Sequence, residues 1–298
     1  MLLRQLVSQW LHQNVQHKFQ EVVSEAVRGA EYRFGSPVSL KNPLPCDLVI
    51  LFSLGVEAGG TVDRMRDQVT MRCPNFVEHT GTLDERRVAV IETGVGTTAA
   101  AAATADVVVL HRPSWVISAG FAGGLRADLR RGHMVMADEV VNLHQQCLSI
   151  GLHVDRASLA ASPSLHVGRL LTVDHLVHSK AERLCLARDH QAIACDMETF
   201  AIAEVCQREH VRFLSIRIIS EALEEELPKG MERLLEQKSL AARLGAATGV
   251  LLSRPSGIKE MWKLKEDALK ASDRLARFLA GVVAQLPPTP SAGELPPT

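Results

Sequence analysis

From residue 47 to about residue 220, short apolar runs rich in β-branched residues alternate with longer helical patterns. Several runs are almost continuously apolar, as expected for strands that are covered on both faces. Strands that alternate with helices favour an α/β fold, because a helix is the usual crossover between parallel strands. We therefore predict a three-layer α/β/α fold with a central mixed, mostly parallel sheet. The expected strands are 47–54, 87–92, 115–119, 133–137, 168–173, 192–195 and 213–219, with helices between them at 98–110 and 197–210.

The first thirty residues have a different pattern. Apolar side chains such as Leu3, Val7 and Leu11 recur at steps of three and four, which predicts one amphipathic helix. Three prolines between residues 37 and 45 then mark a linker. We expect residues 1–35 to form an extension that packs on its own domain or on a second copy, with contact to a membrane surface through residues 1–30 as the alternative.

The linker and a second proline-rich segment delimit the main domain. We place a catalytic domain at residues 46–286, which ends with helices at 231–252 and 259–286. Five of the thirteen prolines fall in residues 287–298, which predicts a disordered tail.

Composition and spacing exclude several classes of protein. The 33 basic and 34 acidic residues leave no net charge for binding nucleic acid, and no run of about 18 apolar residues exists to span a membrane. The six cysteines form no CxxC pair, which is typical of reduced thiols in a cytoplasmic protein. His175 and His178 have no acid or cysteine at metal-ligand spacing, and no phosphate-binding or dinucleotide motif is complete, so neither metal nor cofactor is expected.

Polar and glycine residues gather just after the apolar strands. Glu57, the Thr93–Gly96 turn, the glycine-rich run at 120–124, Glu198 and Glu221 each follow one predicted strand. In open α/β sheets, ligands bind outside the carboxyl ends of the strands. The sequence therefore predicts one cleft that holds three carboxylates.

Each of these features also has a purely structural interpretation. Glu198 stands where an acid favours the dipole of the following helix, although the surrounding turn is so apolar that a buried carboxylate there needs a partner. Glu57 fits a solvated loop, and Glu221 fits the start of an exposed acidic run. The turn from Thr93 to Thr98 either presents backbone N–H groups to an anion or sugar, or only connects a strand to a helix.

Three segments together resemble one family. Residues 116–125 (VISAGFAGGL), 195–206 (CDMETFAIAEVC) and 213–221 (FLSIRIISE) are similar to the signature segments of the nucleoside phosphorylase and nucleosidase superfamily, and most resemble its methylthioadenosine/S-adenosylhomocysteine nucleosidases. The resemblance covers roughly residues 47–225. It implies hydrolysis of the N-glycosidic bond of a 5′-substituted purine nucleoside, as in methionine salvage, by a cytoplasmic homo-oligomer for which a dimer is the first choice.

The resemblance also implies residue roles. Glu198 would bind the ribose hydroxyls and Met197 would pack beside the sugar. Glu57 would orient and deprotonate the attacking water. Glu221, which stands where the family has an aspartate, would protonate the departing base, and Leu176 takes the place of an aromatic ring. The further residues expected to contact substrate are Thr93, Gly94, Gly123, Val177 and Arg217.

Two other functions remain open on the sequence. The first is phosphorolysis, including that of a hopanoid-associated type, in which phosphate replaces water; Arg126 and Arg217 would then supply positive charge. The second is a non-catalytic nucleoside-binding protein. The expected partners are a small nucleoside and a second copy of the chain, without nucleic acid.

Overall fold

The structure is a computed structural model, and it describes residues 45–152, 162–225 and 257–287, with the side chains of 257–264 left aside. All of these residues belong to the compact unit Pro45–Thr298. The predicted amino-terminal helix, the helix at 231–252 and the proline-rich tail from residue 288 lie outside the described residues. No described helix is both long and apolar enough to cross a bilayer.

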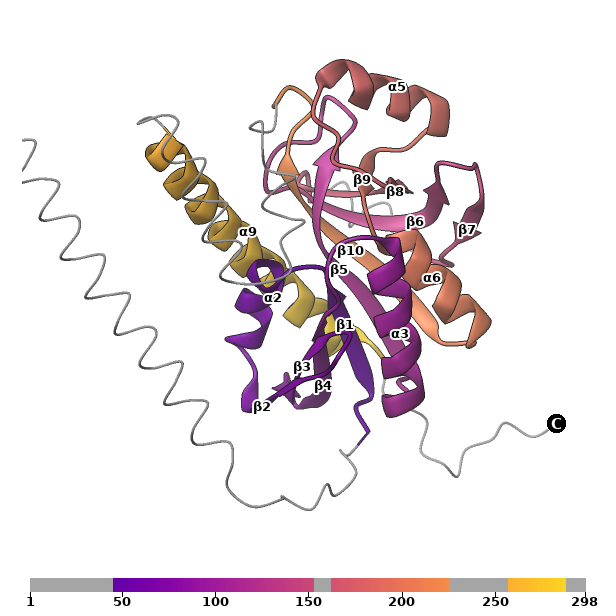
Figure 1. The fold of residues 1–298 in the computed structure, drawn as a ribbon, viewed down its shortest axis with the longest axis vertical. Helices are drawn as coiled ribbons and strands as arrows, with labels where there is room; N and C mark the ends of the chain where they lie inside the picture. Colours follow the sequence, from indigo (N-terminus) through magenta and orange to yellow (C-terminus); the bar gives the residue numbers. More distant parts are fainter. Residues whose placement is uncertain (1–44, 153–161, 226–256, 288–298) are drawn as a thin grey trace, which may run out of the picture. The chain divides into compact units, whose positions relative to one another are not determined.

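Four parallel strands form the centre of the sheet (Figure 1). Strand β1 (Leu48–Phe52) pairs in parallel with β4 (Arg86–Glu92) on one side and β5 (Trp115–Gly124) on the other. Strand β10 (Arg212–Glu221) runs parallel to β5. The carboxyl ends of these four strands therefore meet at one edge of the sheet.

A second group of strands closes part of the sheet on itself. Strand β10 pairs antiparallel with β6 (Met134–Asn142), which runs parallel to β8 (Leu165–Thr172). Strand β8 is parallel to the short β9 (Ala194–Asp196), and β9 pairs antiparallel with the end of β5. The ring β5–β10–β6–β8–β9 brings the ends of β5, β9 and β10 together.

Antiparallel strands at the edges complete the predicted mixed sheet. Strands β2 (Arg66–Arg72) and β3 (Val77–Leu83) form a hairpin that pairs with β4, and β7 (Cys147–Ser149) pairs with β6. The sequence did not reveal these three strands. In β2 the reason is plain, because nearly all its side chains are exposed and polar and give no apolar run.

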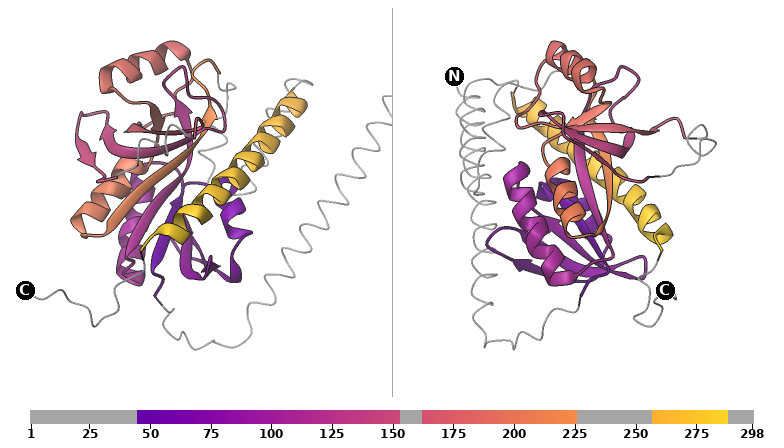
Figure 2. Two further views of the ribbon diagram at one scale, coloured as in Figure 1. Left: turned by 180° about the vertical axis from the view of Figure 1, so that it is seen from behind. Right: turned by 90° about the vertical axis from the view of Figure 1, so that its right-hand side faces the viewer.

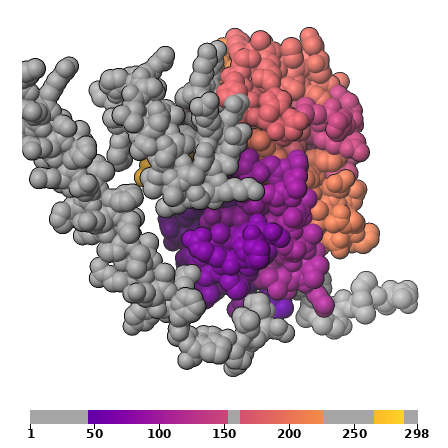
Figure 3. Space-filling view, in the orientation of Figure 1, coloured from indigo at the N-terminus to yellow at the C-terminus, as the bar shows by residue number. Residues whose placement is uncertain are grey.

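Helices cover the two faces of the sheet, which confirms the predicted layers. In β1 the side chains of Leu48, Ile50 and Phe52 enter one core, and those of Val49 and Leu51 enter the other. The first core contains α2 and α9, the second contains α3, and α6 contributes side chains to both; Figure 2 shows α9 across the sheet from α3. In Figure 3 the surfaces of α3 and α6 lie side by side. The helices are α2 (Gly55–Val62), α3 (Thr97–His111), α5 (Lys180–His190), α6 (Thr199–Arg208) and α9 (Gly257–Gln285).

Two predicted boundaries near the carboxylates need correction. The strand predicted at 47–54 ends at Phe52, and Glu57 lies in the first turn of α2 instead of in a loop. The glycines of α2 concealed this helix, because glycine has a low helix propensity. The helix predicted from residue 197 begins at Thr199, with Glu198 at its N-cap position.

Candidate active site

A cavity of about 390 Å³ lies at the carboxyl ends of the central strands. A larger cavity of about 1050 Å³ has no aspartate or glutamate among its described lining residues, so we take the smaller one as the candidate site. Of the ten predicted site residues, seven line this cavity and three do not, namely Thr93, Gly94 and Arg217. The seven that line it are Glu57, Gly123, Leu176, Val177, Met197, Glu198 and Glu221.

Four donors hold the Glu57 carboxylate. Its Oε2 accepts hydrogen bonds from the Ser53 N–H (3.1 Å), the Ser53 hydroxyl (2.7 Å) and the Leu54 N–H (2.9 Å). Its Oε1 accepts from the Phe121 N–H at 2.8 Å. Only 4 % of the residue is exposed, and burial raises the pKa of Glu57, although the hydrogen bonds from Phe121 and Ser53 oppose the rise. The carboxylate is therefore fixed in direction and more basic than one in water.

The long helix α9 supports the helix that carries Glu57. The Ser272 hydroxyl donates to the Glu57 carbonyl oxygen at 3.0 Å and accepts from the Gly60 N–H at 2.9 Å. A Cβ atom on Gly60 would lie 2.7 Å from the Ser272 carbonyl oxygen, so only glycine permits this approach. The contact between α2 and α9 thus fixes the backbone position of Glu57.

Glu198 is buried at the start of α6. The residue is 7 % exposed, and its Oε1 accepts from the Gly96 N–H at 2.8 Å. Burial, followed by the nearby negative charge of Asp196, raises the pKa of Glu198 to about 8. Without a ligand, the carboxyl group is therefore mostly protonated at neutral pH. Hydroxyl donors or a developing positive charge in the cavity would favour its ionised form.

Arg217 lies beneath the cavity in a buried network. Its Nη2 donates to Asp196 Oδ2 at 2.7 Å, to the Ser118 hydroxyl at 2.7 Å and to the Thr199 hydroxyl at 2.6 Å. Asp196 also accepts from the Thr199 N–H at 3.1 Å and so caps α6. The predicted substrate contact of Arg217 is thus replaced by a structural one, because the buried Asp196 carboxylate takes the guanidinium as its partner.

The glycine turn after β4 contacts the site through its backbone. The Thr93 hydroxyl donates to the Gly94 carbonyl oxygen at 2.8 Å, and the side chain is buried away from the cavity. Gly94 and Gly96 have φ angles of +84° and +96°, which favour glycine. Val95 lines the cavity, and the Gly96 N–H serves Glu198. The turn therefore positions a carboxylate in this structure.

Glu221 ends β10 and enters the cavity from a different strand. A register shift separates Ile219 from Glu221, and the Ser220 hydroxyl donates to Glu221 Oε2 at 2.6 Å. Burial raises the pKa of Glu221, while the Ser220 hydrogen bond and the charges of Arg183 and Arg131 lower it. A raised pKa makes a carboxyl group better suited to carry and donate a proton.

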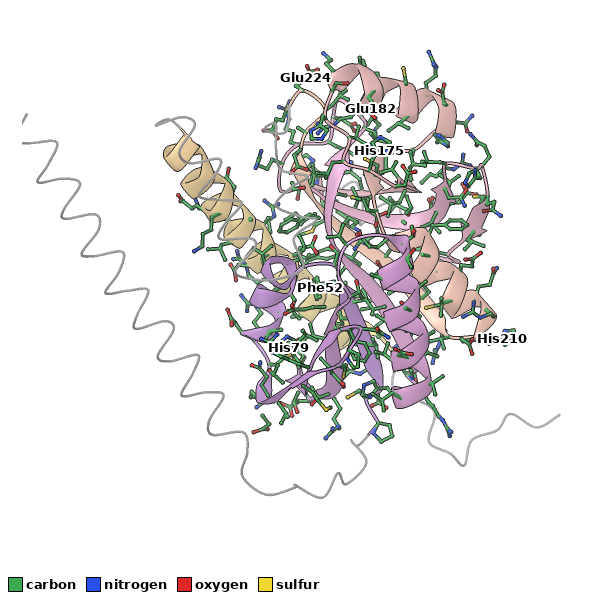
Figure 4. The ribbon with its side chains drawn as sticks, viewed as in Figure 1. Phe52, His79, His175, Glu182, His210 and Glu224 are labelled. Atoms are coloured by element: carbon green, nitrogen blue, oxygen red, sulfur yellow. The ribbon has the colours of Figure 1, made fainter. Side chains whose placement is uncertain are left out.

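Apolar side chains and a charged rim complete the cavity. Leu176, Val177 and Met197 provide apolar surface beside the carboxylates. His175, also in the wall, contacts Glu182 through Nε2 at 2.7 Å; Figure 4 shows the two side chains together beside α5. Hydrogen bonds to Asp174 and Glu182 raise the pKa of His175. Across the described ranges, no group of three or more histidine, cysteine, aspartate or glutamate side chains is arranged to hold a metal ion.

Comparison with known proteins assigns the family. The model of the phosphorylase superfamily matches residues 48–252. The chain belongs to this superfamily. Two relatives are the 5′-methylthioadenosine/S-adenosylhomocysteine nucleosidases of Hydrogenovibrio crunogenus and Haemophilus ducreyi, each 28 % identical. The alignments cover 57 % and 52 % of this chain and 83 % and 80 % of the relatives.

Solved structures of the phosphorylase superfamily share the fold. The Neisseria meningitidis 5′-methylthioadenosine/S-adenosylhomocysteine nucleosidase, in complex with methylthio-immucillin-A, has a TM-score of 0.59 and 20 % identity, over 80 % of this chain and 99 % of that one. A futalosine hydrolase mutant of Helicobacter pylori has a TM-score of 0.58 and 19 % identity, over 80 % of this chain and 99 % of that one. These likenesses confirm the predicted fold class, and the family model confirms the resemblance.

Several residues that shape the site in this superfamily member were not foreseen. Ser53 and Phe121 hold Glu57, Ser220 contacts Glu221, and Ser272 supports α2 from a helix more than two hundred residues away. A hydroxyl group or a backbone N–H has no distinctive sequence pattern, so these contacts become visible only in three dimensions. Gly120 had a signal in its glycine-rich run: a Cβ atom there would lie 2.9 Å from Glu57 Oε1.

Proposed function

We propose that this protein hydrolyses the N-glycosidic bond of a purine nucleoside that carries a 5′ substituent. The observation that carries the proposal is the convergence of three carboxyl groups with raised pKa values, those of Glu57, Glu198 and Glu221, on one cavity. Glycoside cleavage passes through an oxocarbenium-like transition state and uses acid and base groups on two sides of the breaking bond. The names of the relatives support the same bond class.

In this proposal Glu198 binds the sugar and stabilises its developing positive charge. The ribose hydroxyls donate to its carboxylate, and the ionised form stabilises the positive charge that grows on the sugar. Burial raises the pKa of Glu198 to about 8, so the group holds a proton in the free protein. The arriving hydroxyl donors favour the ionised form, and the proton passes to the solvent. Much of its stabilising effect therefore develops with the substrate and the transition state.

Glu57 and Glu221 act at the two ends of the reacting bond. Glu57 accepts a proton from the attacking water, since its four donors hold the carboxylate in one orientation. Glu221 donates a proton to the departing base. General acid or base help of this kind contributes about 10²–10⁴-fold in rate.

The positions of Arg126 and Arg217 and the charge of Glu57 favour water over phosphate, although Arg131, Arg183 and Lys265 line the cavity. Arg126 is exposed and binds Asp128, and Arg217 is buried against Asp196, so neither cation expected for phosphate lines the cavity. Glu57 would repel an incoming phosphate by about 4 kcal/mol for one unit charge at about 4 Å and an effective dielectric constant near 20. We therefore place hydrolysis ahead of phosphorolysis.

The finer assignments belong to the same proposal. The names of the relatives make 5′-methylthioadenosine and S-adenosylhomocysteine the first substrates to test. We propose a role in nucleoside catabolism and methionine salvage in the cytoplasm, and a homo-oligomer, most simply a dimer. The residues proposed to touch substrate are Gly123, Leu176, Val177, Met197 and Glu198.

The test is release of free base from nucleosides with varied 5′ groups, with and without phosphate. We expect that phosphate does not accelerate the release of the purine base. The release should fall strongly in Glu57→Ala, because this variant lacks the carboxylate that accepts the proton of the attacking water. Gly59→Ala on the same helix is the matched control, since a Cβ atom there meets nothing within 4 Å. Phosphate-dependent formation of a sugar 1-phosphate would replace hydrolysis by phosphorolysis, and no turnover of any nucleoside would indicate a binding protein.

A further inference from the structure

Arg183 is a fully buried arginine in the wall of the candidate active site. The residue belongs to α5 and is 1 % exposed, which makes it one of the largest buried side chains among the described residues. Its guanidinium Nη1 donates to the carbonyl oxygens of Ala222 (2.6 Å) and Glu225 (2.7 Å). Its Nη2 donates to the Val177 carbonyl oxygen at 3.2 Å. A guanidinium bound to carbonyl groups retains its full positive charge.

These three carbonyl groups come from two different segments, each of which contains or directly follows residues of the cavity wall. Val177 lies in the segment after β8, on the apolar side of the cavity. Ala222 and Glu225 belong to the segment that directly follows Glu221 at the end of β10. The planar guanidinium of Arg183 therefore joins the segment after β10 to the segment that contains Val177. It fixes the position of one segment relative to the other.

We propose that Arg183 is a positioning residue for Glu221, which it holds where that carboxyl group protonates the departing base. This inference rests on the proposed function, because it assigns Glu221 the role of acid. The guanidinium acts through the backbone on either side of the cavity and through its charge, and it does not itself enter the reaction.

The other links between α5 and these segments are exposed and contribute little. Lys180 Nζ lies 2.6 Å from Glu224 Oε2, and the two side chains are 48 % and 65 % exposed. His175 Nε2 lies 2.7 Å from Glu182 Oε1. Figure 4 shows Glu224, His175 and Glu182 gathered at this end of the molecule, over the α5 region. Exposed ion pairs contribute little to stability, so the buried guanidinium is the stronger connection.

The charge of Arg183 also acts on Glu221. It lowers the pKa of Glu221 against the effect of burial, together with Arg131, while Glu225 raises it. Loss of the Arg183 charge therefore raises the pKa of Glu221. Activity that needs protonated Glu221 falls as the pH rises through this pKa, so the alkaline limb of the rate profile moves to higher pH in a variant without the charge. The other titratable groups that line the cavity are Glu57, His175, Cys195, Asp196, Glu198, Lys265 and Asp267.

The experiment compares four single variants and one double variant of the full-length chain by base release, with kcat and KM measured separately across pH. Arg183→Met removes both the hydrogen bonds and the charge, and Arg183→Lys keeps the charge but loses the planar fork. Glu221→Gln removes the acid. Arg188→Met on the same helix is the control, because that side chain is 74 % exposed. A displacement of about 1 Å at a reacting group can cost about 10²-fold in rate.

We expect kcat to fall about 10- to 100-fold in Arg183→Met, with KM changed less than about threefold, and the alkaline limb to move to higher pH. Arg183→Lys should also have a lower kcat, but its alkaline limb should stay at the wild-type pH. If Arg183→Met does not fold, Arg183→Lys alone tests the inference. The double variant Arg183→Met/Glu221→Gln should be no slower than Glu221→Gln alone.

Three results overturn the inference. Wild-type kcat with an unmoved limb in folded Arg183→Met, or wild-type kcat in folded Arg183→Lys, would reduce Arg183 to a purely structural residue. Independent, multiplicative losses in the double variant would show that Arg183 does not act through Glu221. A wild-type protein that releases no base from any nucleoside would overturn the proposed function itself, and this outcome is separate because it is seen before any variant is compared.

Discussion

Replacing Gly120 by alanine tests whether the placement of the Glu57 carboxylate controls turnover. Gly120 lies in β5, directly before Phe121, whose N–H donates to Glu57 Oε1 at 2.8 Å. An alanine Cβ at this position would lie 2.9 Å from Glu57 Oε1 and 3.2 Å from its Cδ. Carbon and oxygen atoms do not approach so closely, so the carboxylate has to move.

The cost of that movement follows from the donors that hold Glu57. The Ser53 and Leu54 groups all bind Oε2, so the displaced Oε1 loses its Phe121 hydrogen bond first. A hydrogen bond to a charged group is worth about 1.5–3 kcal/mol. At 1.36 kcal/mol for each tenfold change, we expect kcat to fall about 10- to 150-fold. KM should change little, because Glu198 still binds the ribose.

The assay is steady-state base release by Gly120→Ala beside Gly59→Ala, with thermal unfolding of both proteins. Gly59 lies on the helix that carries Glu57, and a Cβ atom there meets nothing within 4 Å, so this variant should keep the wild-type kcat. Wild-type kcat in a folded Gly120→Ala protein would refute the reasoning, since the carboxylate would then work equally well when displaced.

Three further predictions concern buried charge. Glu198→Gln should stay folded and lower kcat/KM by at least about 10-fold, because it loses charge-assisted hydrogen bonds of about 1.5–3 kcal/mol each; base release and circular dichroism check this. The pKa of about 8 at Glu198 lies above its unfolded value, so its contribution to stability is lost as the pH rises from about 4.5 to 8. The melting temperature of the ligand-free protein should fall over this range, and a curve that is equally steep in Glu198→Gln would refute the assignment. Asp196→Asn leaves the buried Arg217 charge without its partner and should destabilise the fold by about 3–5 kcal/mol in denaturant unfolding, whereas a loss below about 1 kcal/mol would show that the pair is not structurally important.

The central strands were predictable because each is largely apolar. The residues of β1 are buried on both faces, and that demand leaves only apolar side chains in the sequence. Strand β2 escaped prediction because it is an edge strand with exposed side chains, and β3 escaped because polar residues interrupt its sequence although some of them are buried. Helix α2 escaped for another reason, since Gly60 is required by close contact with α9 and the three glycines of α2 disguise a helix as a loop.

The site was predictable in outline but not in its contacts. The order of strands placed Glu57, Glu198 and Glu221 at one edge of the sheet, and the structure brings all three to one cavity. The direction of the Arg217 side chain was not predictable, because it depends on the buried Asp196 that competes for it. The role of Arg183 was equally hidden, since its acceptors are backbone carbonyl groups that every residue possesses.

The central claim is that water, activated at Glu57, attacks the sugar carbon of a purine nucleoside. Turnover of 5′-methylthioadenosine in oxygen-18 water, in the presence of phosphate, tests it most directly, with mass spectrometry of the released sugar. We predict free base and a sugar that carries one heavy oxygen at the former glycosidic carbon, formed at a rate that phosphate does not change. Base release that yields an unlabelled sugar 1-phosphate and stops when phosphate is removed would contradict the claim.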